Sequence, residues 1–105
     1  MAAEFCCITI TNNPSRSNLR WIVHFEGKVV SWKMENETGE QILTIVMTDG
    51  TNNFTCHTAN KLAKVLNEHI YEGMEIEVRG KSTFEDPYTI VDNYRFQPIE
   101  WKKWR

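Results

Sequence analysis

The sequence predicts an all-β fold, a small closed β-structure that carries a single helix. Apolar and polar residues alternate in several stretches of strand length, whereas residues 60–70 repeat with a helical period. Glycines interrupt the alternating stretches, as they do where a strand bulges or bends sharply. The stretch 71–81 combines these features, because apolar and charged residues alternate between a turn at Gly73 and the interruption at Gly80. We therefore expect a half-buried antiparallel strand directly after the helix.

Length and composition predict a single domain. The chain has 105 residues, of which 41% are hydrophobic, and no Pro- or Gly-rich spacer divides it. We expect one domain over 1–105, with a barrel core at about 8–96 and a basic aromatic tail at 97–105. Apolar runs such as 42–47 are too short for a membrane span, and residues 1–9 lack a basic start followed by an apolar stretch. We therefore expect a soluble intracellular protein, in the nucleus or the cytoplasm, with no membrane partner.

The first part of the chain predicts the long first strand of the barrel, preceded by a short strand or an extended arm. Residues 6–11 alternate weakly, which indicates a short strand or an extended arm. A long strand is expected over 20–34, and Gly27 shifts its alternation in the manner of a bulge. Trp21 and Phe25 lie on the inward parity of this strand, so we expect both in the core.

A hairpin follows the long strand. Residues 41–48 are rich in β-branched side chains, and Asp49-Gly50 is a strong hairpin signal. The returning strand at 53–58 would place Phe54 and His57 on opposite faces.

The helix and two further strands complete the predicted order. The helix would be capped by Thr58 or Asn60 and end at Ile70. Its apolar stripe consists of Leu62, Val65, Leu66 and Ile70. The fourth strand lies in the stretch 71–81, and after a short loop the fifth strand spans 88–96.

The order of these elements favours one particular barrel. Five strands with a helix between the third and the fourth are typical of the Greek-key barrel of the oligonucleotide-binding (OB) type. SH3-like barrels also have five strands and remain an alternative, although they usually lack a helix at this position. The predicted fold class is therefore all-β, a five-stranded Greek-key OB-fold barrel with one helix between strands 3 and 4.

Signatures of enzymes and metal sites are missing from the sequence. Cys6, Cys7 and Cys56 have no partners at zinc-ligand spacing, so we expect reduced thiols, no metal and no cofactor. We find no H-E-x-x-H, G-x-S-x-G or phosphate-binding glycine loop, so we expect no catalytic residues and no enzymatic activity. The formal charge is −2, from 12 Lys and Arg against 14 Asp and Glu. Any binding to a polyanion must therefore depend on local patches of charge.

A set of short motifs gives a family resemblance. In chain order the motifs are Asn13-Pro14, Trp21 to Val23, Val30-Ser31-Trp32, Asp49-Gly50, Thr55-Cys56-His57, Gly80-Lys81 and Pro87-Tyr88-Thr89. Over roughly 8–96 this set resembles the single-stranded-DNA-binding OB domains of the replication protein A large subunit. The resemblance implies that two aromatic side chains stack on bases, at the positions of His57 and Tyr88. His57 departs from the family, which commonly has Phe there.

The resemblance also implies basic residues in the loop between the first two strands. This sequence has Lys33 at the edge of that loop, with Glu35, Glu37 and Glu40 beyond it. These acidic residues do not fit the phosphate-clamping role that the resemblance implies for the loop.

The candidate nucleic-acid-binding residues combine flat side chains for bases with cations for phosphates, because stacking contributes ~1–3 kcal/mol per base. The flat side chains are Trp32, His57, Phe84 and Tyr88, and the cations are Lys28, Lys33, Arg79, Lys81 and Arg95. Lys28 would face Arg79 and Lys81 if the first and fourth strands pair. Two other interpretations are open: Tyr88 packs at the barrel mouth, or Arg79 and Lys81 form a solvated face balanced by acidic neighbours.

Three functions are compatible with these observations. The first is binding of single-stranded DNA with low sequence preference, in replication, recombination or repair. The second is an OB-fold subunit of a larger complex, in which Trp101 and Trp104 of the tail bind a protein partner or a second copy of the chain. The third is RNA binding, because the same platform accepts either polymer.

Overall fold

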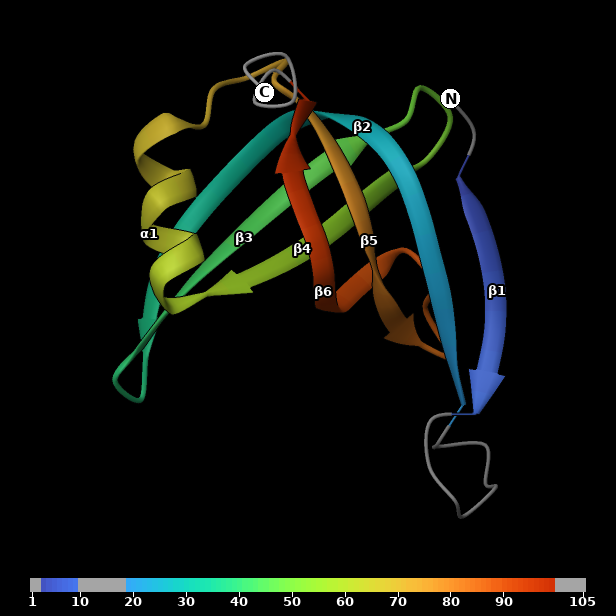
Figure 1. Ribbon diagram of the computed structural model, residues 1–105. Helices are drawn as coiled ribbons and strands as arrows, with labels where there is room; N and C mark the ends of the chain where they lie inside the picture. The colour runs from blue at the N-terminus through green and yellow to red at the C-terminus, as the bar shows by residue number, and fades with distance from the viewer. Residues whose placement is uncertain (1–2, 10–18, 100–105) are drawn as a thin grey trace.

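The described residues of the protein form mostly β structure with one helix of more than a turn, α1, as expected for the all-β class (Figure 1). A computed structural model describes residues 3–9 and 19–99. The elements in chain order are β1 (Glu4–Thr9), β2 (Leu19–Glu37), β3 (Glu40–Thr48), β4 (Asn53–Ala59), α1 (Asn60–His69), β5 (Glu75–Thr83) and β6 (Thr89–Pro98). No helix in the described residues is long and apolar enough to cross a membrane.

The strands form one sheet that closes on itself. Their order is β1-β2-β3-β4-β6-β5, and an additional pairing of β2 with β5 completes a ring. All pairs are antiparallel except β4 with β6, which run parallel through Thr55–Thr89 and Cys56–Ile90. The prediction placed five strands in the barrel and a short strand or an extended arm before them, at 6–11, and the described residues form six strands. The additional strand is β1, which lies outside the ring on the first half of β2.

The long strand β2 pairs with two strands of the ring, and the alternation of its inward and outward side chains shifts once along its length. Its first half pairs with β5 and its second half with β3. We expected the shift at Gly27, but the register changes between Val29 and Ser31, where Val30 is the exposed extra residue. Gly27 instead permits a close approach, since a Cβ atom there would lie 2.9 Å from the carbonyl oxygen of Thr48.

The predicted interruption at Gly80 is confirmed. The register between β5 and β6 shifts on both sides of this residue, after Arg79 and after Lys81. A Cβ atom on Gly80 would lie 2.6 Å from the carbonyl oxygen of Asp92 and 2.6 Å from Cγ2 of Ile90. Glycine is therefore required here for the close packing of two backbones.

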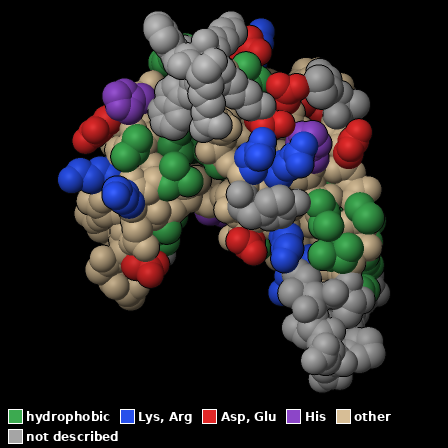
Figure 2. All heavy atoms as spheres, in the orientation of Figure 1, with side chains coloured by type: hydrophobic (Ala, Val, Ile, Leu, Met, Phe, Trp, Pro, Cys, Tyr) green, Lys and Arg blue, Asp and Glu red, His purple; other side chains and the backbone are tan. Residues whose placement is uncertain are grey.

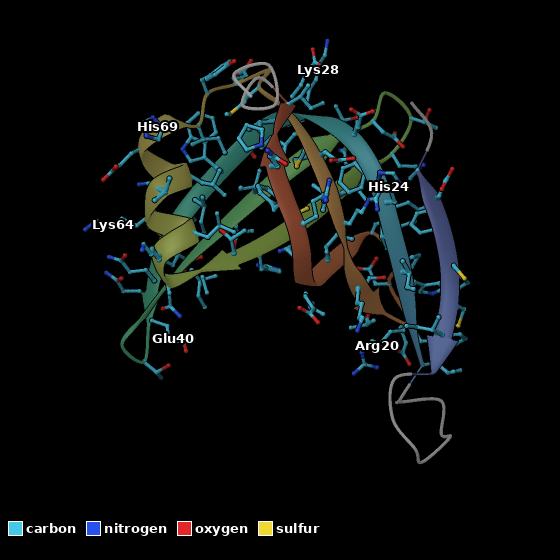
Figure 3. All side chains as sticks on the ribbon, in the orientation of Figure 1. Arg20, His24, Lys28, Glu40, Lys64 and His69 are labelled. Atoms are coloured by element: carbon cyan, nitrogen blue, oxygen red, sulfur yellow. The ribbon has the colours of Figure 1, made fainter. Side chains whose placement is uncertain are left out.

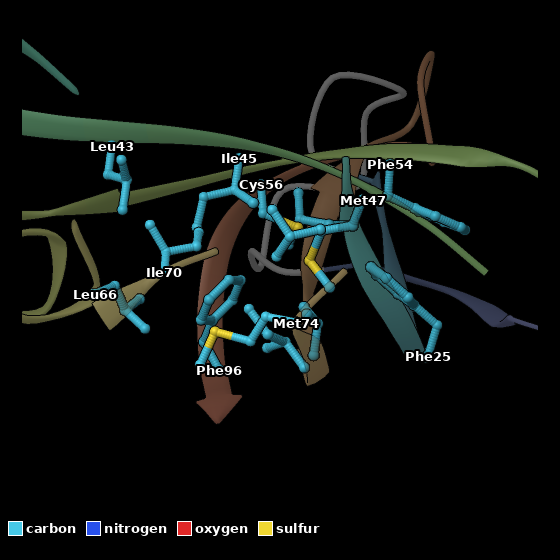
Figure 4. Packing of buried hydrophobic residues seen from close by; sticks show 14 of the residues in the cluster. Phe25, Leu43, Ile45, Met47, Phe54, Cys56, Leu66, Ile70, Met74 and Phe96 are labelled. Carbon is cyan, nitrogen blue, oxygen red and sulfur yellow. The ribbon is translucent and has the colours of Figure 1, made fainter. Parts of the chain in front are cut away.

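Apolar side chains fill the interior of the ring from one end to the other (Figure 4). Leu43, Leu66 and Ile70 lie at the end near α1, and Phe25 and Phe54 lie at the opposite end. The rings of Phe25 and Phe54 stack with their centroids 4.0 Å apart. Alternate residues of β3, β4 and β5 are fully buried in this core. The residues are Leu43, Ile45, Met47, Phe54, Cys56, Ile76 and Val78.

The helix matches its predicted span but differs in its contacts. Neither Thr58 nor Asn60 caps it: the N-cap is Ala59, and no side chain accepts a hydrogen bond there. Asn60 has a φ of +57°, in the left-handed region that asparagine tolerates. Leu62 and Val65 of the predicted stripe are exposed, because the helix packs on the sheet through Ala63 and Leu66. A period of 3.6 residues indicates an apolar side of a helix, but it does not fix which part of that side the sheet covers.

The hairpin turn at Asp49-Gly50 is confirmed. Oδ1 of Asp49 accepts hydrogen bonds from the backbone N–H groups of Thr51 (2.9 Å) and Asn52 (2.8 Å). Burial acts to raise the pKa of Asp49, but donors on Asn52, Thr51 and Ala3 outweigh it and lower the pKa below its usual 3.8. The contact with Ala3 also ties the turn to the start of β1.

Thiol labelling tests the placement of β1 and of the core. Cys6 and Cys7 are exposed, whereas Cys56 is buried, and burial raises the pKa of its thiol to about 12. At low protein concentration and mildly alkaline pH, iodoacetamide is expected to alkylate two cysteines in the native protein, as counted by mass spectrometry. The third should react only after unfolding in guanidinium. Alkylation of Cys56 in the native protein would contradict this placement.

Candidate nucleic-acid interface

Two arginines and a histidine lie side by side on the outer face of the ring. Within the ladder of β2, β5 and β6, Arg79 is directly opposite His24 on one side and Arg95 on the other. Figure 2 shows Lys and Arg side chains gathered beside a histidine on this face, and Figure 3 labels His24 there. We call His24, Arg79 and Arg95 the basic row. Arg79 and Arg95 are like charges directly opposite each other, an arrangement that costs a sheet some stability.

A buried carboxylate holds the two outer members of the basic row. Oε2 of Glu77 lies 3.3 Å from Nε2 of His24, and Oε1 of Glu77 lies 3.5 Å from NH1 of Arg95. The Glu77 side chain is only 9% exposed, so these contacts are partly shielded from water. No ion pair of Arg79 is found within the described part of the chain. Of the two arginines, Arg79 is therefore the one whose charge is less compensated.

Lys81 extends the basic row by one step along β5. It is half-buried and lies opposite Ile22 on β2 and Asp92 on β6. We expected Lys28 to face Arg79 and Lys81 once the first and fourth strands paired. The strands do pair, but Lys28 lies opposite Glu75 at the other end of β5. That part of the prediction is wrong because pairing partners depend on register, which the alternation alone does not give.

Lys28 contributes to a different feature, an open cavity of about 430 Å³. The cavity is lined by Glu26, Gly27, Lys28, Thr48, Asp49, Gly50 and Glu75. Three carboxylates therefore surround a single lysine, which disfavours phosphate at this end of the molecule. Figure 3 shows Lys28 at the top, above His24.

A second row crosses the outer face of β2, β3 and β4. Lys33 is opposite Thr44, and Thr44 is opposite His57. Oγ1 of Thr44 lies 3.1 Å from Nδ1 of His57, close enough for a hydrogen bond that fixes the plane of the imidazole. Lys33 is within 3.9 Å of Glu35, but both side chains are exposed, so this pair leaves the lysine available.

The two rows belong to one continuous band around the ring. Cys56 of β4 pairs with Ile90 of β6, and these two strands run parallel. The next residue on each strand, His57 and Val91, therefore points outward at the same level. The side-chain amide of Asn93 donates to the carbonyl of His57 and holds the two strands together beyond their ladder. We call this band the outer belt, and its members are Lys33, Thr44, His57, Val91, Lys81 and Arg79. It offers a fixed flat ring and an exposed apolar side chain between cations.

The loop between β5 and β6 is ordered by its own side chains. Asp86 accepts hydrogen bonds from the N–H of Tyr88 (3.0 Å) and from the hydroxyl of Thr89 (2.6 Å). The N–H of Thr55 on β4 donates to the carbonyl of Tyr88 over 2.8 Å. Tyr88 is therefore held close to the strand that carries His57.

The predicted aromatic residues of this loop pack against the protein itself. The Tyr88 ring lies 5.5 Å from Phe5 and 5.3 Å from Phe54, yet the residue is 37% exposed. Phe84 stacks on Trp21, with centroids 6.1 Å apart and planes 4° from parallel. Trp21, expected in the core, is only half-buried, and its Nε1–H donates to the carbonyl of Phe84 over 3.0 Å. Of the two loop rings, Tyr88 retains the more accessible surface.

Trp32 lies apart from the outer belt. It is opposite Ile45, whose side chain is buried, so Trp32 is on the inward parity while the neighbouring Lys33 is on the outward one. The indole is nevertheless 38% exposed. Trp101 and Trp104 of the predicted partner-binding tail lie outside the described residues.

Sequence reasoning brought only part of this surface together. It named Lys33, His57, Arg79, Lys81 and Arg95, which the structure places on the outer face. It missed a second set, which is His24, Glu77, Thr44, Asp86 and Val91. For Glu77 the sequence contained one signal of a special role, because it is an acidic residue between apolar residues inside a predicted strand. The roles of the other four residues depend on their neighbours on adjacent strands, and the sequence contained no signal of them.

Comparisons with protein families, with curated proteins and with solved structures return no significant match to this chain. The function must therefore be inferred from the surface itself.

Proposed function

We propose that the ring is a Greek-key barrel of the OB type. The strand order β2-β3-β4-β6-β5, the parallel pairing of β4 with β6 and the helix between β4 and β5 support this assignment. In OB barrels, ligands bind across the second and third strands and the two loops beside them. The corresponding elements here are β3, β4, the β2–β3 turn and the β5–β6 loop. SH3-like barrels remain the alternative.

We further propose that the outer belt binds single-stranded nucleic acid with little sequence preference, in replication, recombination or repair. The observation that carries this proposal is the position of His57, in the middle of β4 and flanked on the outer face by Lys33 on one side and by Lys81 and Arg79 on the other. A flat ring accepts any base, and the cations accept the backbone. Figure 2 shows the molecule hollowed along its lower edge, between the lobe with α1 and the lobe with β1.

The charges on either side of this hollow differ. Figure 3 shows Glu40 at the tip of the β2–β3 turn and Arg20 on the opposite lobe. A polyanion would therefore contact β4, β6 and β5 more closely than the acidic turn. This orientation assigns phosphate binding to the basic row and not to the turn that the family resemblance implied.

Titration with a fluorescent thirty-nucleotide oligo-dT tests the proposed function. We expect a dissociation constant in the micromolar range or tighter at low salt, with binding that weakens as salt increases, since released counterions make phosphate contacts salt-dependent. His57→Ala should weaken binding about tenfold, equivalent to ~1–3 kcal/mol of lost stacking. The matched control is His69→Ala, which removes an exposed histidine at the end of α1. Absence of binding at low salt would exclude the proposal, and an oligo-rU titration compares RNA with DNA.

A protein-binding subunit is the second candidate, because two apolar residues of α1 face solvent. Leu62 is 38% exposed and Val65 is 36% exposed. Such residues fit a partner surface better than a nucleic-acid groove. A chain truncated before Trp101 should change its oligomeric state in size-exclusion chromatography if the tail supplies the interface, and no change would exclude that role of the tail.

A further inference from the structure

Strand β1 is the open edge of the sheet. Within the described residues it pairs with β2 alone, whereas every other strand has a neighbour on both sides. Figure 1 shows β1 at the rim of the molecule. Every second residue of an edge strand directs its N–H and C=O outward, so such an edge is a template for another strand.

This edge lacks the features by which proteins usually prevent strand addition. The ladder of β1 with β2 has no bulge, and between Glu4 and Thr9 there is no lysine and no proline. The only charge is Glu4, at the end of the strand. The middle of the strand offers Cys6 and Cys7, both exposed.

We propose that β1 pairs antiparallel with β1 of a second copy of this chain, with Cys6 next to its own counterpart. A two-fold axis normal to the sheet is the operation that extends one sheet into its copy with antiparallel strands. This axis keeps the core-facing side of both copies on the same side of the sheet. Residues that pair across it must therefore share parity, so their numbers add to an even sum.

The even sum restricts the register to few choices. Around the middle of β1, either Cys6 or Cys7 lies on the axis. With Cys6 on the axis, Phe5 pairs with Cys7 of the second copy and Glu4 pairs with Ile8 of the second copy. With Cys7 on the axis, the pairing moves away from Glu4.

Charge selects the register centred on Cys6. On β2, His24 lies opposite Glu4 and Arg20 lies opposite Ile8. Pairing Glu4 with Ile8 of the second copy therefore creates one outer-face row: His24, Glu4, then Ile8 and Arg20 of the second copy. Strands are ~4.8 Å apart, so the carboxylate of Glu4 lies two strands from Arg20 of the second copy, within reach of a long arginine side chain. The acidic residues of the two copies do not meet.

The dimer would be weak and reversible. A pair of short edge strands buries less surface than the ~1,000 Å² of stable interfaces. Its consequence is a continuous sheet in which the basic rows of both copies share one outer face, joined through β1. This inference does not depend on nucleic-acid binding, since the pairing rests on the edge and its charges alone.

Sedimentation equilibrium over a range of protein concentrations, under reducing conditions, tests the proposal. We expect the mass to rise from monomer towards dimer with concentration. Cys6→Lys places two ammonium groups side by side at the axis and should leave only monomer, whereas Cys6→Ser should still dimerise. The control Ser31→Lys introduces the same charge at an exposed site of β2 outside β1 and should not change the equilibrium. A wild-type protein that is monomeric at all concentrations, or a dimer that survives Cys6→Lys, overturns the proposal.

Oxidative cross-linking tests the register. Copper(II)–phenanthroline removes one electron from each of two thiolates, and each copper(II) is reduced to copper(I) as the disulfide forms. Antiparallel neighbours have Cα atoms ~4.5–5.5 Å apart, a spacing that a disulfide can bridge. Cys7→Ser should cross-link as well as wild type, and Cys6→Ser should not cross-link. Cross-linking through Cys7 alone overturns the proposed register, and loss of the dimer on removing residues 100–105 overturns the assignment to β1.

Discussion

Gly80→Ala is expected to destabilise the protein by about 3 kcal/mol, because the added methyl group has no space. A Cβ atom would lie 2.6 Å from a backbone oxygen of β6, and that strand cannot move away without breaking its ladder with β5. For a domain of this size, the loss corresponds to a decrease in Tm of roughly 10–20 °C. Thermal unfolding followed by circular dichroism measures it.

Two variants separate this steric effect from other consequences of substitution at the bend. Lys81→Ala changes the adjacent residue without a clash and should alter the free energy of unfolding by less than about 0.5 kcal/mol. Gly39→Ala puts alanine at a φ of +83° in the β2–β3 turn, where nothing lies within 4 Å of the new Cβ atom. It should cost only the ~1 kcal/mol of a left-handed conformation. If Gly80→Ala were no more destabilising than Gly39→Ala, the close approach of β5 and β6 would be wrong.

The stretch around Gly80 shows what a local pattern can predict. Alternation from Met74 to Val78 gave the buried face, and the glycine gave the bend, because both depend on neighbouring residues in the chain. At Gly27 the prediction of a bulge was wrong, although apolar residues alternate around this glycine as well. There the glycine accommodates the carbonyl of Thr48 on another strand, and the shift of register falls at Val30. The sequence does not distinguish a glycine at a bulge from a glycine at a close approach.

The outer face was harder to predict than the core. His57 and Arg79 were named from their residue types, but their neighbours Thr44, His24 and Arg95 come from other strands. Cross-strand partners depend on register, and a slip of one residue would send each side chain to the opposite face. The position of β1 was unpredictable for the same reason: its weak alternation indicated a strand but not its partner. Phe5, which closes the aromatic cluster over Tyr88, therefore received no role in advance.

Arg79→Glu is expected to weaken binding of oligo-dT at least tenfold, about 1.4 kcal/mol, if the basic row contacts phosphates. The change reverses the charge at the centre of the row, between His24 and Arg95. Each lost phosphate contact on a single strand should also reduce the slope of log K against log salt by ~0.7. Fluorescence anisotropy at several salt concentrations gives both quantities.

The matched control for this variant is Lys64→Glu, which makes the same change of net charge on the exposed side of α1. It should leave the affinity within about twofold, because at moderate salt a charge beyond the ~10 Å Debye length is largely screened. Equal losses in the two variants would mean that only net charge matters and that the basic row is not a contact surface.

The free energy of unfolding distinguishes a binding role of Arg79 from a structural one. Arg79 is exposed and lies opposite His24 and Arg95, so its charge makes no favourable pair across the ladder, and Arg79→Glu should unfold within about 0.5 kcal/mol of wild type.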